Sequence, residues 1–214
     1  MVRRTKEEAL ATRHRLLDAA ELLFHAQGVS RTSLGEIALK AGATRGAVYW
    51  HFKDKADLFN AMIERVTLPL EQALQIGLNA QAGNALGVMR SAVVDYLRQM
   101  TTDAQLRRVF EVAMHQVEYV HELQAVRDRH LAVRKLCIVD ITLGLDMAAR
   151  DQGVTLAVPA GVAAWVLHGL VVGLVQDWLL DDGIFELVAT GEAALDVYFR
   201  GLGLARPGES STEA

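Results

Sequence analysis

Basic and aromatic side chains recur over residues 44–55 at helical spacing. If Val48 lies on the buried side of a helix, Arg45 and Tyr49 point outward. A guanidinium group can bond both acceptors on a guanine edge, and a tyrosine ring can pack on a thymine methyl group or on the sugar-phosphate chain. These residue types therefore suit contact with duplex DNA.

Phosphate contacts are expected beside this base readout, because helix N-termini and cationic side chains bind phosphate oxygens. Gly46 leaves room for the helix backbone to approach the duplex. Trp50 is expected to pack against the first helix or the neighbouring protein surface rather than on a base. In this interpretation Arg45 reads a guanine, and phosphates are positioned by Thr32, Ser33, Thr44, His51, Lys53 and Lys55.

Two helices separated by a tight turn are needed to hold these side chains. Ser33 and Glu36 have capping-box spacing, so one helix should begin at Ser33, and Gly42 suits the positive φ just beyond its end. Thr44 is a good N-cap for a second helix that runs to about His51. A helix, a turn at glycine and a second helix form a helix-turn-helix, whose second helix fits the DNA major groove.

This stretch resembles the recognition-helix signature of the TetR family of transcription regulators. It reads Thr44-Arg-Gly-Ala-Val-Tyr-Trp-His-Phe-Lys-Asp-Lys-Ala-Asp-Leu58, and the similarity extends over residues 5–60. The opening Met-Val-Arg-Arg-Thr-Lys-Glu-Glu and the Tyr-Trp-His-Phe core are similar to the branch that represses multidrug efflux pumps, with AcrR-like and TtgR-like members. The resemblance implies a double-stranded DNA operator, a small-molecule effector and a homodimer formed through the last two helices.

The composition fits a helical protein of the cytoplasm. Of 214 residues, 51% are hydrophobic and only three are proline, which is ample for a buried core built from helices. The single Cys137 excludes an internal disulfide, and the charged N-terminus lacks the apolar segment of a secretory signal. Residues 1–55 hold 10 Lys and Arg against 6 Asp and Glu, whereas the remainder holds 12 against 20, so one end is expected to face DNA.

We expect an all-α protein of about nine helices in two domains. Residues 1–55 are predicted to form a three-helix DNA-binding domain, residues 56–204 a helical ligand-binding and dimerisation domain, and residues 205–214 a disordered tail. A long helix that begins after Asp54 is expected to join the two domains, and Pro69 is expected to kink this helix. Later helices are expected at about 84–101, 104–116, 118–152, 159–180 and 184–202.

One of these helices is apolar enough to raise the question of a membrane span. Residues 157–175 are nearly all apolar, and Gly169 and Gly173 have the spacing of a transmembrane dimerisation face. However, Asp177 lies at one end, and no Lys or Arg occurs between residues 151 and 199 to orient a span. A helix that is apolar on every side is also typical of one buried in protein. We therefore expect no membrane, and packing against the last helix and its mate in a second subunit.

Sequence templates for catalysis are absent. There is no Gly-x-Ser-x-Gly elbow, P-loop, Rossmann glycine fingerprint or Cys-x-x-Cys pair, so no enzyme activity, catalytic residue or cofactor is expected. Glu118 and His121 match the Glu-x-x-His of carboxylate metal sites, but the sequence holds no second copy. A solvated helix face is the preferred interpretation, without a metal.

Apolar side chains on the middle helices are expected to line a cavity for a hydrophobic ligand, although plain core packing is the alternative. Ligand sites of drug size are usually apolar cavities with a few polar groups. By the layout of the resembling repressors, Phe110, Met114, Val171 and Val172 would line the cavity. The candidate ligand-binding residues are Val66, Leu70, Leu74, Leu78, Met89, Val93, Tyr96, Phe110, Met114, Cys137, Ile141, His168, Val171, Val172 and Gln176.

Together these patterns predict a ligand-responsive repressor that binds a palindromic operator as a homodimer. A hydrophobic molecule would release it, and a multidrug efflux operon would be its target. Two alternatives stay open. One is a helical ligand-binding protein or enzyme with a vestigial DNA-binding head, and the other is a DNA-binding protein without an effector.

Overall fold

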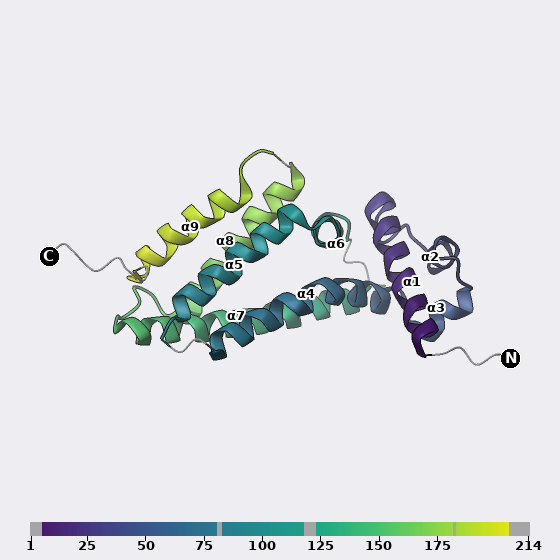
Figure 1. Cartoon of the computed structure of the whole chain (residues 1–214). Coiled ribbons are helices and arrows are strands. Elements are labelled where there is room, and N and C mark those ends of the chain that lie inside the picture. The colour runs from purple at the N-terminus through teal and green to yellow at the C-terminus, as the bar shows by residue number, and fades with distance from the viewer. Residues whose placement is uncertain (1–5, 81–82, 118–122, 182, 206–214) are drawn as a thin grey trace. The chain divides into compact units, whose positions relative to one another are not determined.

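The computed structural model describes residues 6–80, 83–117, 123–181 and 183–205, and of residues 69–80 it describes the backbone alone. Within these residues the chain forms nine α-helices and no strand, as Figure 1 shows, which confirms the expected all-α fold. The helices are α1 (Lys6–Gln27), α2 (Leu34–Lys40), α3 (Arg45–His51), α4 (Lys55–Ala80), α5 (Ala85–Thr102), α6 (Ala104–His115), α7 (Gln124–Gln152), α8 (Ala160–Leu180) and α9 (Leu187–Gly201).

Helix ends in the first part of the chain lie where the capping residues predict them. The Ser33 hydroxyl accepts a hydrogen bond from the Glu36 N–H at 3.2 Å, while the Glu36 carboxylate accepts from the Ser33 N–H at 2.8 Å. This capping box begins α2. Gly28 and Gly42 have φ of 85° and 63° just beyond α1 and α2, a backbone conformation that residues with a side chain rarely adopt.

The helices pack into two units. The first unit comprises residues 1–67 and 105–131, and the second comprises residues 68–104 and 132–214. Helices α4 and α7 therefore each contribute residues to both units. The predicted first domain ends at residue 55, just after α3. The first unit extends beyond that limit, because residues 56–67 and 105–131 also pack with the first three helices.

The core of the first unit lies between the head, by which we mean α1–α3, and parts of α4, α6 and α7. Apolar residues recur on the inner side of each helix, and burying them against one another stabilises the unit. Its fully buried members include Leu16, Leu17, Phe24, Ile37, Val48, Leu58, Met62, Val109, Val112 and Leu123.

In the second unit, α5, α8 and α9 run side by side (Figure 1), with α9 packed on both of the others. Gly191 allows the close approach of α9 to α5, because a Cβ atom at this position would collide with Cδ1 of Leu97. Tyr198 of α9 donates its hydroxyl to the Ala163 carbonyl of α8 at 2.6 Å. Burial raises the pKa of Tyr198 to about 12, so this hydroxyl keeps its proton at neutral pH.

Helix α8 is the one helix of the described residues that is long and apolar enough to cross a membrane, by length and composition alone. Its buried side includes Ala163, Ala164, Leu167 and Val175. On the other side, Val162, Trp165 and Val166 are 53%, 52% and 53% exposed. Nothing lies within 4 Å of where a Cβ atom would stand at Gly169 or Gly173. One side of α8 therefore packs within the chain, and the other presents an open apolar surface.

Candidate functional site

The helix-turn-helix of α2 and α3 places the basic and aromatic residues of α3 on the outside. The Thr44 hydroxyl caps α3 by accepting from the Ala47 N–H at 3.2 Å. Val48 is fully buried and Phe52 is 2% exposed, so these residues hold the inner side of the helix in the head. The exposed residues are Arg45, Gly46, Tyr49, Trp50 and Lys53. The short helix therefore offers a guanidinium group and two aromatic rings to an outside partner.

Arg45 and Tyr49 contact each other across one turn of α3. Nη2 of Arg45 donates to the Tyr49 hydroxyl at 3.3 Å, and Cζ of Arg45 lies 5.7 Å from the centre of the tyrosine ring. This hydrogen bond raises the pKa of Arg45 above its ordinary value, so the group stays cationic. The two side chains thus present a cation and an aromatic ring together, as contact with a guanine and its neighbouring base or sugar requires.

Trp50 lies on the surface of the head, so the structure does not support its predicted packing against the first helix. Its side chain is 71% exposed, and its ring meets the ring of His51 edge-on with centres 4.5 Å apart. The outward position of Trp50 could have been predicted from the sequence, because Trp50 follows Gly46 by four residues and therefore lies on the same side of the helix. Trp50 joins the candidates for DNA contact.

Two of the predicted phosphate contacts, Thr32 and Lys55, are buried. Thr32 is 1% exposed, and its hydroxyl donates to the Gly28 carbonyl at 2.8 Å. Lys55 is 9% exposed, and its Nζ donates to the carbonyls of Ser30 and Thr32, both at 3.2 Å. In this structure both side chains stabilise the turn before α2 instead of facing outward, so their placement does not support the predicted phosphate contacts.

The other phosphate candidates remain accessible. Ser33 and Thr44 are exposed while they cap α2 and α3, and Lys53 is exposed directly after α3. His51 is partly buried, and residues 1–5, which include the basic arm, lie outside the described residues. Hydroxyl groups, a cationic side chain and helix N-termini gathered around α3 form the kind of surface that binds a phosphate backbone.

The predicted ligand-binding residues are divided between the two units. Val66, Phe110 and Met114 belong to the first unit and are partly buried. Leu70, Leu74 and Leu78 lie where the backbone alone is described. The members of the second unit whose side chains are described are Met89, Val93, Tyr96, Cys137, Ile141, His168, Val171, Val172 and Gln176. The cavity that this set would line stays a prediction.

Within the second unit these residues have different surroundings. Met89 is 4% exposed and belongs to the core of the unit, whereas Gln176 is exposed. Burial raises the pKa of the Tyr96 hydroxyl far above its ordinary value, and the nearby Cys137 adds to the increase. His168 meets Trp165 edge-on, with ring centres 6.2 Å apart.

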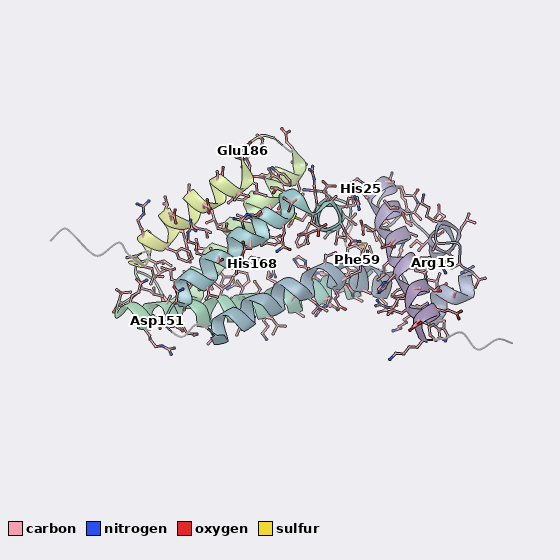
Figure 2. All side chains as sticks on the ribbon, in the orientation of Figure 1. Arg15, His25, Phe59, Asp151, His168 and Glu186 are labelled. Carbon is pink, nitrogen blue, oxygen red and sulfur yellow. The ribbon has the colours of Figure 1, made fainter. Side chains whose placement is uncertain are left out.

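A hollow of about 560 Å³ lies in the second unit where α7 ends and α8 begins. Its lining includes Asp146, Arg150, Thr155 and Pro159, and none of the predicted ligand-binding residues. Close to it in the chain, Asp151 (Figure 2) accepts a hydrogen bond from the Ala85 N–H at 3.0 Å and ties the end of α7 to the start of α5. This hollow and the predicted ligand site do not coincide.

The metal-site motif of the sequence, Glu118 and His121, lies outside the described residues. Among the residues that the structure describes, no three His, Cys, Asp or Glu side chains gather closely enough to hold a metal ion. Polar side chains of the first unit pair with one another, as His25 (Figure 2) does with Glu111, with Nε2 and Oε2 2.7 Å apart.

Comparison with known proteins identifies the two parts of the chain. A family model for bacterial regulatory proteins of the tetR family matches residues 16–62. A second model, for the C-terminal region of MAATS-type transcriptional repressors, matches residues 84–203. The transcriptional regulator AcrR of Shigella flexneri is 38% identical over 195 residues, which cover 87% of each chain.

Two solved structures share both the fold and the sequence. NalD, the secondary repressor of the MexAB-OprM multidrug efflux pump in Pseudomonas aeruginosa, is 36% identical with a TM-score of 0.83, over 91% of this chain and 97% of NalD. SmeT of Stenotrophomonas maltophilia in complex with triclosan is 32% identical with a TM-score of 0.81, over 95% of this chain and 98% of SmeT. These relatives are transcriptional regulators and not enzymes, in line with the sequence prediction. The chain belongs to the TetR family of bacterial transcriptional regulators, among the relatives that repress multidrug efflux pumps.

Proposed function

We propose that this protein is a ligand-responsive repressor that acts in the cytoplasm as a homodimer on a palindromic operator. Its target would be a multidrug efflux operon, as for the relatives NalD and SmeT. The observation that carries the proposal is the outward set of Arg45, Tyr49 and Trp50 on a short capped helix. A helix that presents a cation and two rings, with hydroxyl groups and a lysine at its ends, matches what a major groove and its phosphates offer.

Each recognition helix would read one half-site. Arg45 is placed to donate to O6 and N7 of a guanine, the commonest specific contact between a side chain and a base. Tyr49 would pack on a thymine methyl group or a sugar, and Trp50 offers a second ring beside it. Lys53 and the helix caps Ser33 and Thr44 would contact phosphates and so fix the position of the helix in the groove.

The open side of α8 supports dimerisation through the last two helices. Val162, Trp165 and Val166 are each about half exposed there, and Val197 of α9 is 65% exposed. Large apolar side chains exposed together in this way are typical of an interface. A second copy of the chain would bury them. The absence of Lys and Arg between residues 151 and 199 leaves no positive flank to orient a membrane span, which argues against lipid as the covering partner. Two recognition helices would then meet half-sites about 34–36 Å apart, or a multiple of that distance.

The effector is proposed to be a hydrophobic small molecule held by the ligand-binding residues named above. Most of those residues are apolar, and SmeT has been solved with the hydrophobic compound triclosan. Such a molecule releases the operator only if it binds the free and DNA-bound conformations with different affinity. A tilt of α4 that moves the two heads apart is the proposed change, since the half-site spacing then no longer fits.

The operator can be identified by sequencing genomic fragments that the purified full-length protein retains. Fluorescence anisotropy with a labelled operator then measures affinity, and triclosan serves as the first probe. We expect enrichment of a palindromic site, and weaker operator binding as triclosan is added. Failure to enrich any sequence would contradict the DNA-binding function, whereas triclosan binding with unchanged operator affinity would contradict the proposed release.

Arg45→Ala distinguishes the repressor from the first alternative, and the response of the unmodified protein to a hydrophobic compound distinguishes it from the second. A repressor should lose its sequence preference, whereas a ligand-binding protein or an enzyme with a vestigial head should keep its binding or turnover. A DNA-binding protein without an effector would bind its operator normally and respond to no hydrophobic compound. The exposed position of Arg45 and its pairing with Tyr49 favour the repressor.

A further inference from the structure

A buried carboxylate on α1, Glu21, bonds to both α4 and α6 in the first unit. The Glu21 side chain is 2% exposed. Arg65 of α4 donates Nη2 to Oε2 at 3.0 Å, and Arg108 of α6 donates Nε to Oε1 at 2.9 Å. Gln105, also on α6, donates Nε2 to Oε2 at 2.9 Å. One side chain of the head therefore joins three helices.

The charges in this cluster are balanced. Besides Glu21, Arg65 bonds Asp18, one turn earlier on α1, through Nη1 at 2.6 Å. Two guanidinium groups, of Arg65 and Arg108, thus meet two carboxylates. The Glu21 carboxylate is closed to water, although the Asp18 side chain is 57% exposed, so loss of the arginine partners of Glu21 would leave a buried charge without compensation. This disfavours any arrangement that breaks the bonds to Glu21. The cluster therefore favours one relative position of α1, α4 and α6.

Apolar packing alone would not fix this position as narrowly. The core between α1 and α4 contains Phe24, Leu58 and Met62, and apolar contact has no preferred direction. Charge-assisted hydrogen bonds, in contrast, have defined lengths and angles. The bonds to Glu21 therefore set the orientation of the head on α4 and α6, while the core provides most of the cohesion.

Helix α6 is bonded to the head at a second place and also carries predicted effector contacts. His25, near the end of α1, bonds Glu111 at 2.7 Å. Phe110 and Met114, two predicted ligand-binding residues, stand on the same helix as Arg108. A movement of α6 would therefore act on α1 through these hydrogen-bonded side chains.

We propose that Glu21 is a positioning residue for DNA recognition. It fixes the angle between the head and helices α4 and α6. This angle determines at which half-site spacing the two heads of a dimer can bind DNA together. Glu21 does this without touching DNA, because its carboxylate is enclosed by Arg65, Arg108 and Gln105. The inference rests on the proposed function as a dimeric operator-binding protein.

The test measures half-site spacing preference in the full-length protein. Glu21→Gln keeps the size of the side chain and removes its charge. Operators are made with one base pair inserted or deleted between the half-sites, which moves them by about 3.4 Å and rotates them by about 35°. We expect the unmodified protein to lose about tenfold or more in affinity on the altered operators, and Glu21→Gln to lose about twofold or less. The two losses then differ by about fivefold or more, which is within the usual range of coupling between sites.

A second variant and a control separate positioning from general stability. Arg108→Gln removes the charged one of the two bonds from α6 to Glu21 and leaves the bond from Gln105. It should relax the spacing preference in the same direction, and it provides the test if Glu21→Gln fails to fold. Asp95→Asn breaks the exposed ion pair with Arg98 on α5 and should leave the preference unchanged. Circular dichroism checks that each variant is folded.

The outcomes distinguish this inference from the proposed function. An unmodified protein that binds no operator contradicts the proposed function itself. If it binds and discriminates spacing, but the folded Glu21→Gln and Arg108→Gln variants discriminate equally well, the positioning role is wrong. The same holds if the variants lose affinity equally on every spacing, which is the result of a merely structural role, or if the unmodified protein shows no spacing preference.

Discussion

Lys53 and Lys55 are two residues apart in the sequence but should have separate roles. Lys53 is exposed directly after α3, whereas Nζ of Lys55 donates to the carbonyls of Ser30 and Thr32. Substitution of either lysine by methionine removes the charge and keeps most of the length of the side chain. We expect Lys55→Met to lower stability and Lys53→Met to change the salt dependence of DNA binding.

The magnitude for Lys55→Met follows from its two hydrogen bonds. Both are 3.2 Å long, at the long end of the usual range, so each is worth about 1 kcal/mol. The free energy of unfolding should fall by about 2 kcal/mol, which lowers Tm by about 4–8 °C in a chain of this length. The slope of log affinity against log salt should not change, because no phosphate contact is lost.

Lys53→Met should have the opposite signature. Each phosphate contact contributes about 0.9 to the slope of log affinity against log salt, so the loss of one contact in each half of a dimer reduces the slope by about 1.8. Its Tm should remain that of the unmodified protein, because the side chain is exposed. Operator binding by fluorescence anisotropy between about 50 and about 200 mM salt gives the slope, and thermal unfolding followed by circular dichroism gives Tm.

Lys135→Met, a matched change at an exposed lysine of α7, should alter neither quantity. The decisive result is the one for Lys55→Met. An unchanged Tm together with a reduced salt slope would mean that Lys55 contacts phosphate in the complex, and that its bonds to Ser30 and Thr32 do not stabilise the head.

Three other substitutions probe the recognition helix and the second unit. Arg45→Ala should reduce the discrimination between bases at one position of each half-site by about 5- to 150-fold without lowering Tm. Selection of binding sites from random DNA measures this preference, and a preference that the variant retains would contradict the prediction. Tyr198→Phe should reduce the alkaline loss of stability. Because its folded pKa is about 12, above the unfolded value of about 10, the folded state keeps a proton that the unfolded state releases, and stability falls as pH rises through this range. Urea unfolding on both sides of this range measures the change, and an unchanged pH dependence would contradict it. Gly191→Ala should lower the free energy of unfolding by about 1–3 kcal/mol through collision with Leu97, and the same change should cost less in a chain that already carries Leu97→Ala if the collision is the cause.

The sequence predicted those parts of the head that depend on neighbours in the chain. The capping box of Ser33 and Glu36, the N-cap at Thr44 and the positive φ of Gly42 each involve residues within a few positions, and the structure has all three. The outward direction of Arg45 and Tyr49 followed from the helical repeat in the same way. Local capping and periodicity were sufficient for these features.

Contacts between distant residues could not be predicted in this way. From the sequence alone, Lys55 resembles an ordinary surface lysine. In the structure its Nζ donates to carbonyls 23 and 25 residues earlier in the chain. Glu21 reads as a helical surface acid, yet its partners Arg65, Gln105 and Arg108 are 44, 84 and 87 residues away. Hydrophobic periodicity indicates that a helix has a buried side, but not which charged groups will meet at its edge.

The predicted ligand cavity is harder still to infer from sequence. A cavity exists only where side chains from several helices leave space between them, so its walls depend on helix separation as much as on residue type. Met89 illustrates the difficulty, because an apolar residue that is 4% exposed has the same sequence signature in a core as in a cavity wall. The residues that line the hollow near Arg150 show no apolar periodicity from which the hollow could have been predicted.

The exposure of Trp50 gives the molecule a built-in optical probe. Of its three tryptophans, Trp50 is 71% exposed, Trp165 is 52% exposed and Trp178 is 8% exposed. Indole emission shifts to shorter wavelength when water is replaced by apolar surroundings, so the three rings start from different spectra. Chains that retain a single tryptophan would report separately on the duplex, on the outer side of α8 and on the interior, without an attached dye.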